Sequence, residues 1–397
     1  MRARRHMYAD NDDVIYVDNN ATTCIAPEVL QAMQPFQTKY YGNPSSIYPF
    51  SGPAATAIRE ARTALAELLQ ASEPEEIIFT SGGSESNNAA ILSALQTQIG
   101  RRKILSSVVE HPAVLNLCRS LQKRGYQVDY LGVDSQGRMD LVEAEALIDE
   151  QTAIVSVMTA NNEIGNVYPI YELAELAHAK GALFHSDAVQ AAGKMPLRLR
   201  DSQIDFLSLS GHKLHAPKGI GALYRRRFLP FKPLIIGGHQ ENGQRAGTEN
   251  VAAIAGLGRA AQLAMSNMTA EAAHVRQLRD RLEAALLSSC PDSVVNGDLS
   301  SRLPNTSNIS FKYIEGEAIL LRLYLAAKVC ASSGSACTTG SLEPSHVLRA
   351  MGLDYTALHG SVRFSFSRYN TEADVDAILQ ALPPIVKDLR ELSPFGR

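Results

Sequence analysis

The sequence lacks long apolar runs and any marked excess of charge of one sign. Its 397 residues include 38 Lys and Arg against 41 Asp and Glu, a formal net charge of −3. No apolar stretch reaches the roughly 20 residues that a membrane-spanning helix needs. The near balance of charges provides no electrostatic argument for binding nucleic acid. We therefore expect a globular protein of two or three domains that engages neither membranes nor nucleic acid.

Cysteine is scarce, and its placement excludes two kinds of site. The cysteines are odd in number, widely spaced and without a C-x-x-C pair: Cys24, Cys118, Cys290, Cys330 and Cys337. This argues against a disulfide framework or a zinc ribbon and favours a reducing, cytoplasmic setting in which a functional cysteine acts as a thiol. Residues 1–13 are basic with no apolar segment behind them, so we interpret them as a disordered or extended lead-in, not a signal peptide.

Short apolar runs alternate with helical periodicity between Ile77 and Tyr224. Such alternation predicts an α/β fold with a mostly parallel sheet covered by helices, and with ligands at the carboxyl ends of the strands. After about Gly258 the pattern changes to two helical stretches, Ala260–Ser266 and Ala270–Leu287, and then a sparser mixture of elements. We interpret residues 14–259 as a large domain and 260–397 as a smaller α+β domain. The first strand, residues 14–17, fits either.

A lysine and an acid follow two of the predicted strands. Ile204–Leu209 runs into Ser210-Gly-His-Lys213, and Ala182–Ser186 runs into Asp187. This pair suits a pyridoxal phosphate (PLP) site, where a lysine amine forms a Schiff base and a carboxylate pairs with the pyridine nitrogen. At an effective dielectric near 20, a carboxylate roughly 4 Å from that nitrogen contributes about 4 kcal/mol. Alone, each residue is more typical of a solvated lysine or a turn; together they favour the cofactor.

Other candidates would contact the phosphate of such a cofactor. Gly83 and Ser84 belong to a glycine-rich turn between a strand and a helix, residues 80–86, where backbone N–H groups point toward an anion. Ser210 and His212 are side-chain donors beside the lysine. Taken alone, the turn at 80–86 is more often only a tight turn with a helix cap.

Three further loops carry polar residues. His111 follows a strand and would stack on the cofactor ring and move protons, because imidazole titrates near neutrality; a histidine that merely lies near a helix start is the alternative. Asn162 follows another strand and would bond a ring hydroxyl or a substrate carboxylate. The glycine-rich segment 237–248 is too long for a simple connector, and Thr248 is predicted to cap the helix after it.

The predicted small domain adds two features. Arg363 lies in an alternating strand, where an inward guanidinium suits an amino acid's carboxylate; a solvent-facing arginine is the alternative. Cys337 lies among small residues in the segment 332–344, which favours an exposed thiol whose pKa is lowered by local dipoles or by a cation such as His111. The other four cysteines are predicted to be buried as small apolar residues.

Together these elements resemble the cysteine desulfurases of the NifS/IscS type, which are fold-type I PLP enzymes. The resemblance covers nearly the whole chain, through the motifs at residues 16–23, 42–46 and 361–364. Its most specific piece is Ser333-Gly-Ser-Ala-Cys337, which with residues 340–346 is closest to the NifS branch, associated with nitrogenase cluster assembly. The chain departs from the family pattern at Cys24, often proline or arginine there, and at Ser84, usually threonine.

The resemblance implies a role for each candidate. The catalytic residues would be Lys213, His111 and Cys337, the last as sulfur acceptor. Cofactor contacts would come from residues in the loops described above and near Asp187: Asp187, Gln190, Gly83, Ser84, Ser210, His212, Asn162 and, from the other subunit, Thr248. Arg363 and Asn162 would hold the substrate carboxylate, with Asn43 nearby.

The function so implied is that of a homodimeric, PLP-dependent cysteine desulfurase, which converts L-cysteine to L-alanine. The persulfide left on Cys337 would pass to a scaffold protein for iron–sulfur clusters. Alternatives are another PLP lyase, such as a selenocysteine lyase or cysteine sulfinate desulfinase, and a non-catalytic iron-carrying scaffold. No resident metal is expected: His212 and His215 lack further ligands, and Cys337 is considered only as a transient iron–sulfur ligand.

Overall fold

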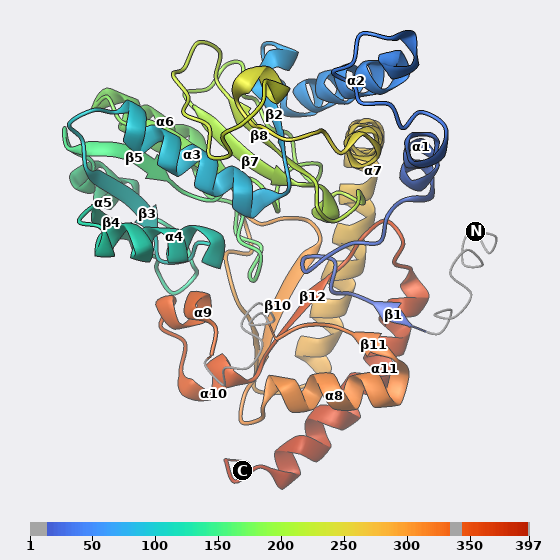
Figure 1. The fold of residues 1–397 in the computed structure, drawn as a ribbon. Helices are drawn as coiled ribbons and strands as arrows, with labels where there is room; N and C mark the ends of the chain where they lie inside the picture. Colours follow the sequence, from blue (N-terminus) through green and yellow to red (C-terminus); the bar gives the residue numbers. More distant parts are fainter. Residues whose placement is uncertain (1–13, 334–343, 396–397) are drawn as a thin grey trace.

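The computed structural model describes residues 14–333 and 344–395 as two units, each with its own apolar core (Figure 1). The larger unit contains a seven-stranded sheet in the order β2-β8-β7-β6-β5-β3-β4. Its strands are β2 (Ile77–Thr80), β3 (Lys103–Ser107), β4 (Gln127–Leu131), β5 (Thr152–Ser156), β6 (Leu183–Asp187), β7 (Phe206–Ser210) and β8 (Gly221–Arg225). Its helices are α1 (Pro27–Thr38), α2 (Gly52–Leu69), α3 (Gly83–Thr97), α4 (Pro112–Lys123), α5 (Leu141–Leu147) and α6 (Ile170–Ala179).

Helices cover both faces of this sheet, as the alternation of strands and helices predicted. Successive side chains of a strand point to opposite faces. Ile104 of β3 therefore packs with α3 and α4, whereas Leu105 packs with the core that includes α1, α2, α5 and α6. Burial on both faces explains why most of these strands are short and rich in apolar residues.

The direction of the strands decides where the candidate residues meet. β3, β4, β5, β6 and β7 pair in parallel, and β8 alone lies antiparallel, between β7 and β2. β2 therefore runs in the same direction as β7. The carboxyl ends of β2, β3, β5, β6 and β7 lie at one edge of the sheet, where α/β proteins bind their ligands.

The smaller unit has an antiparallel sheet in the order β12-β10-β9 and a parallel pair, β1 with β11. Its elements are β1 (Ile15–Tyr16), β9 (Ser293–Val295), β10 (Thr306–Phe311), β11 (Val329–Cys330), β12 (Ser361–Ser365), α8 (Gly316–Ala327), α9 (His346–Ala350), α10 (Tyr355–His359) and α11 (Glu372–Leu392). The first strand thus joins a strand more than 300 residues later, and Val17 is buried in the smaller core.

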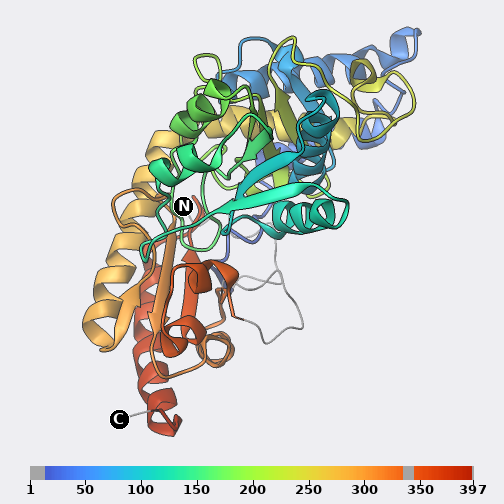
Figure 2. The same cartoon turned by 90° about the vertical axis from the view of Figure 1, so that its left-hand side faces the viewer.

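One helix, α7 (Val251–Ser289), stands where the sequence predicted two. Between Ser266 and Ala270 there is neither proline nor glycine, so nothing interrupts the backbone hydrogen bonds. Its first half is buried in the larger core and its second half in the smaller one (Figure 2). The predicted boundary at 259/260 therefore lies inside a helix that both units share.

The start of α7 differs from its prediction as well. The side chain of Asn250, not of Thr248, accepts the capping hydrogen bond, from the backbone N–H of Ala253. Thr248 is exposed in the segment before the helix. That segment also contains the 3-10 turn η5 (Gln240–Gly243).

Within residues 14–333 and 344–395, no helix is both long and apolar enough to cross a bilayer. The same residues contain no cluster of three or more His, Cys, Asp or Glu side chains placed to hold a metal ion.

Candidate active site

Lys213 and Asp187 lie after adjacent, parallel strands. β6 ends at Asp187, whose register partner on β7 is Ser208, and β7 leads into the 3-10 turn η4 (Gly211–Lys213). The Nζ of Lys213 donates to the backbone carbonyls of Ala21, at 2.6 Å, and of Asn20. The N-terminal loop at 20–23 therefore contacts the amine of Lys213. Thr23 holds the loop in this position, because its N–H and Oγ1 both donate to the carbonyl of His212.

The carboxylate of Asp187 is buried and held from two sides. Its Oδ1 accepts from the N–H of Val189 at 3.0 Å, and its Oδ2 accepts from Nδ2 of Asn87 on α3 at 2.7 Å. A buried carboxylate with these two bonds still has free lone pairs. Asp187 is thus oriented to accept a further hydrogen bond, and Asn87 is a positioning residue that the sequence analysis did not identify.

His111 caps α4: its Nδ1 accepts from the N–H of Ala113 at 3.1 Å. In the neutral ring, Nε2 therefore carries the proton. Burial lowers the pKa of His111 below its usual value, Lys213 lowers it further, and Asp187 opposes the shift. The ring is consequently neutral at pH 7. The lowered pKa disfavours a cationic His111, because burial outweighs the attraction of Asp187. Its effect on the thiol of Cys337 stays a prediction, since Cys337 lies outside the described residues.

The candidate phosphate contacts converge where α3 begins. A Cβ placed on Gly82, whose φ is +154°, would lie 3.7 Å from Oγ of Ser210, and a Cβ on Gly83 would lie 2.6 Å from Cγ2 of Val189. The bare backbone of α3 therefore faces both the end of β7 and the Asp187 loop. Ser84 is exposed in the first turn of α3.

His212 is turned toward the N-terminal loop. Its Nδ1 lies 3.2 Å from Oγ1 of Thr22. Burial, followed by the nearby charge of Lys213, lowers the pKa of His212 to about 4. The ring is therefore neutral at pH 7, and it serves as a hydrogen-bonding group and not as a charge.

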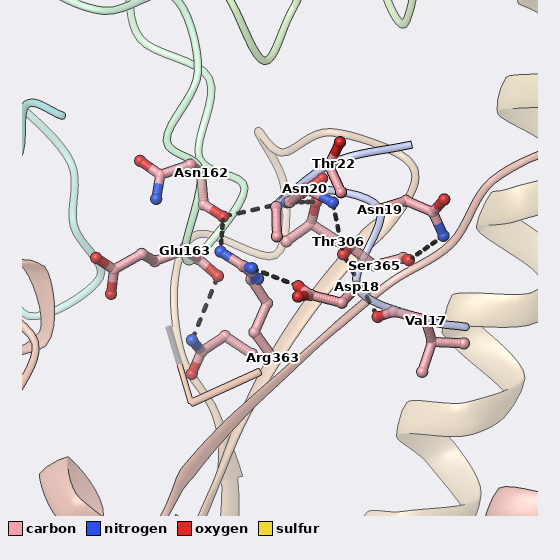
Figure 3. A network of polar contacts seen from close by, with 12 residues as sticks. Val17, Asp18, Asn19, Asn20, Thr22, Asn162, Glu163, Thr306, Arg363 and Ser365 are labelled. Carbon is pink, nitrogen blue, oxygen red and sulfur yellow. Dashed lines mark hydrogen bonds and ion pairs between the residues drawn. The ribbon is translucent and has the colours of Figure 1, made fainter. Parts of the chain in front are cut away.

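Arg363 points inward from β12 and is 3% exposed. Its guanidinium pairs with Asp18 at 2.6 Å and donates to the backbone carbonyl of Asn162 at 2.9 Å (Figure 3). The solvent-facing alternative is therefore excluded. Its Nε is buried without a hydrogen-bond partner among the described residues. The amide of Asn162 points away from Arg363, so the backbone of Asn162, not its side chain, makes the contact.

Two predicted residues are exposed. Asn43 is exposed in a turn, where its Oδ1 accepts from the N–H of Ser45, and Thr248 is exposed before α7. Cys337 lies outside the described residues. Of the other cysteines, Cys118 and Cys290 are buried and Cys330 is partly buried, but Cys24 is exposed. The prediction that Cys24 is buried is wrong: the residue is exposed, although its Sγ lies 4.0 Å from Nδ1 of the buried His215.

Comparison with known proteins was consistent with this geometry. Residues 15–378 match the aminotransferase class-V family. The chain is 58% identical to a cysteine desulfurase of Nostoc sp., over 96% of this chain and 95% of that protein. It is 55% identical to the cysteine desulfurase NifS of Azotobacter vinelandii, over 96% and 94%. The chain belongs to the cysteine desulfurases. A solved NifS-like protein, 37% identical, superimposes with a TM-score of 0.88 and covers 95% of this chain and 100% of that one.

The PLP that this family uses fits the residues present. The start of α3 presents backbone N–H groups and the positive end of a helix dipole, which suit a phosphate. A Cβ on Gly83 would overlap Cγ2 of Val189 at 2.6 Å, so glycine lets the start of α3 lie close to the Asp187 loop. Asp187 retains acceptor capacity for a ring N–H, and Lys213 lies after the next strand. The confirmed fold, family and cofactor thus agree with one constellation at the sheet edge.

Three polar residues at this site escaped the sequence analysis: Asn87, which is buried, and Asp18 and Lys194, which are partly buried. Asp18 and Lys194 had a signal in the sequence. Asp18 lies within the family motif at 16–23, and Lys194 is a lysine amid small and apolar residues four positions after Gln190. Asn87 lies on a helix whose sequence contains nothing that points toward Asp187.

His185 should make stability fall in acid. Its buried ring lies between Oγ of Ser156, at 2.8 Å, and Oγ of Ser208, at 2.9 Å, and burial lowers its pKa to about 3. In the unfolded chain the pKa lies near 6.5, so below that pH the unfolded state binds the extra proton. The titration of His185 therefore leaves the free energy of unfolding undiminished above pH ~7 and should lower it by about 1.4 kcal/mol by pH 5.5.

Urea unfolding at pH 7.5 and 5.5 measures this effect. In His185→Gln, which removes the titrating group but keeps polar atoms, the loss of unfolding free energy between these pH values should be smaller by that amount. The same loss in both proteins would contradict the prediction.

Proposed function

We propose that the protein converts L-cysteine to L-alanine and transfers the sulfur to the thiol of Cys337. The reaction balances as cysteine plus enzyme thiol yielding alanine plus enzyme persulfide. The observation that carries the proposal is the placement of Lys213 and Asp187 at the ends of adjacent parallel strands, beside the glycines of α3. PLP, bound there, supplies the electron sink that this chemistry needs.

The chain's own residues divide the work as follows. Lys213 would hold the cofactor covalently and would move the α-proton of the substrate. Asp187, oriented by Asn87, would keep the ring nitrogen protonated. His111 would contact the cofactor ring and exchange protons. Gly83, Ser84, Ser210 and His212 would contact the phosphate, and Gln190 the ring hydroxyl.

The protein as purified tests this proposal. It should be yellow, lose its colour with borohydride, and release one alanine for each sulfur transferred when cysteine and a reducing thiol are supplied. A colourless protein that stays inactive after incubation with PLP would contradict it and would favour a scaffold without catalysis. Activity that survives loss of Cys337 would favour a PLP lyase acting without a cysteine nucleophile.

Arg363 is proposed to bind the substrate carboxylate. Asp18 compensates the charge of the Arg363 guanidinium and fixes its orientation. The Nε of Arg363 has no hydrogen-bond partner among the described residues and could pair with the substrate carboxylate. Arg363→Ala should raise the KM for cysteine roughly 10- to 100-fold, the effect of losing a charge-assisted hydrogen bond, while the visible spectrum of the bound cofactor stays unchanged.

The matched control is Arg368→Ala, which removes an arginine of the same unit that pairs with Glu271 at 2.9 Å. Its KM should stay near that of the wild type. An unchanged KM for Arg363→Ala would contradict the assignment, because the carboxylate would then be held elsewhere, for instance by Asn162 or Asn43.

We propose that the active unit is a homodimer in which Thr248 of one subunit completes the phosphate site of the other. The support is that Thr248 is exposed in the segment before α7. Retention of PLP should therefore fall as the dimer dissociates on dilution. Sedimentation that finds an active, PLP-saturated monomer would contradict the proposal.

The persulfide on Cys337 is proposed to pass to a scaffold protein for iron–sulfur clusters in the cytoplasm. Similarity to NifS of Azotobacter vinelandii favours a role in nitrogenase cluster assembly. Transfer of labelled sulfur from Cys337 to a purified scaffold protein tests the acceptor.

We also propose that the smaller core, which includes Val17 and the second half of α7, defines the C-terminal domain together with the first strand.

A further inference from the structure

Lys194 is a lysine inside the site to which the mechanism above gives no role. It lies in the turn after β6, and its Nζ is 2.9 Å from Oε1 of Gln190 and 3.3 Å from Oδ1 of Asn20. Burial, and to a lesser extent the charges of Lys213 and Arg363, lowers the pKa of Lys194 to about 7. Keeping an amine beside two cations is unfavourable, so its hydrogen bonds must offset that repulsion.

Both partners of Lys194 are connected to Lys213. The backbone carbonyl of Asn20 accepts from Lys213 and, at 2.9 Å, from Nε2 of Gln190. The side chain of Asn20 is in turn held by Asn305 and Thr306 of the smaller unit. Lys194 therefore braces the same short loop on which the amine of Lys213 rests.

Packing alone does not hold Lys194 in place. A cavity of about 50 Å³ lies against it, lined also by Lys213, Asn305 and Phe366. A side chain beside such a space is free to change rotamer unless hydrogen bonds prevent it. The bonds to Gln190 and Asn20 are therefore what fix its position.

A charged amine only donates hydrogen bonds, so it determines which end of a neighbouring amide faces it. A lysine Nζ, charged or neutral, has at least two N–H groups, so it donates to both oxygens in either form. Gln190 turns its Oε1 to Lys194, and its Nε2 donates to the backbone carbonyl of Asn20, which also accepts from Lys213. Reversal of the amide would set its N–H groups against the charged amine of Lys194 and its Oε1 against that carbonyl.

We propose that Lys194 is a positioning residue that, together with the carbonyl of Asn20, fixes the amide of Gln190 with its second N–H directed toward the cofactor's ring oxygen. The inference rests on the proposed function, in which Gln190 contacts that oxygen. A phenolic oxygen on the ring is an acceptor when ionised, so it requires a donor from the protein. Without Lys194, only the backbone carbonyl of Asn20 orients the amide, and cofactor binding weakens.

A double-mutant cycle on PLP binding tests this coupling. PLP is titrated into apoprotein of the wild type, Lys194→Met, Gln190→Ala and the double variant, following the visible absorption band. Each single variant should bind PLP roughly ten-fold more weakly, and the double variant no more weakly than Gln190→Ala. Lys180→Met, which removes an exposed lysine paired with Glu150, is the control and should bind as the wild type does.

Two results would overturn the inference: losses that multiply in the double variant, or undiminished PLP binding by Lys194→Met. Thermal unfolding of each apoprotein verifies that it is folded. If Lys194→Met does not fold, Lys194→Gln, which keeps a polar end, takes its place in the same cycle. Failure of the wild type to bind PLP would instead contradict the proposed function itself, and an unchanged Gln190→Ala would remove Gln190 from the site and overturn the inference with it.

Discussion

Lys213→Ala should abolish alanine production, lowering turnover by roughly 10³-fold or more, because it removes both the covalent attachment of the cofactor and the group that moves the α-proton. The amine of Lys213 rests on the carbonyls of Asn20 and Ala21, one strand from Asp187. Among the described residues around it, the partly buried Lys194 provides another amine, and this is bonded to Gln190 and Asn20.

Three measurements distinguish this loss from a loss of folding. The variant should still bind some PLP through contacts to the phosphate, should lack the band that borohydride removes in the wild type, and should unfold at a similar temperature. Lys180→Ala, an exposed lysine, is the matched control and should keep full activity. Near-normal alanine production by Lys213→Ala would overturn the central assignment.

Cys337→Ser should bind cysteine but release no alanine, again with a loss of roughly 10³-fold or more. The thiolate is the nucleophile that takes the sulfur, and it attacks best when its pKa lies near the ambient pH. A serine hydroxyl ionises far less readily and cannot form a persulfide. A change in the visible spectrum on adding cysteine should therefore persist in the variant, although turnover stops.

The remaining cysteines serve as controls. Burial raises the pKa of Cys118 to about 12, and it also raises the pKa of Cys290 and Cys330. Cys24 is exposed as a residue, but its sulfur lies 4.0 Å from the buried His215, and partial burial of the sulfur raises its pKa as well. These thiols are therefore poor nucleophiles at neutral pH. Replacing them with serine or alanine should leave activity largely intact, with some loss of stability at Cys118 and Cys290, which are buried. Mass spectrometry after one turnover should find the extra sulfur on the peptide that contains Cys337. Extra sulfur on Cys24 or Cys330, in a Cys337→Ser protein that is still active, would contradict the assignment of Cys337 as the sulfur acceptor.

The sequence was sufficient to place the residues that follow strands. Asp187, Lys213 and His111 each follow a short apolar strand, and parallel strands bring their carboxyl ends to one edge, so local pattern and one general rule place them together. The predicted bounds of α6, Ile170–Ala179, agree with the structure. The family, the cofactor and the reaction were likewise predicted from short motifs, because such motifs are local in the chain.

Only the tertiary structure decided the contacts between distant segments. Asp18 meets Arg363 across 345 residues, and Asn87 meets Asp187 across 100. The local sequence pattern of one segment does not predict its contact with the other, because these contacts depend on how β1 pairs with β11 and how α3 packs on the sheet. The charge of His111, the exposure of Cys24 and the continuity of α7 depend in the same way on burial, which the whole fold determines. The sequence specifies that residue 194 is a lysine, and the fold places its amine where it donates a hydrogen bond to Gln190.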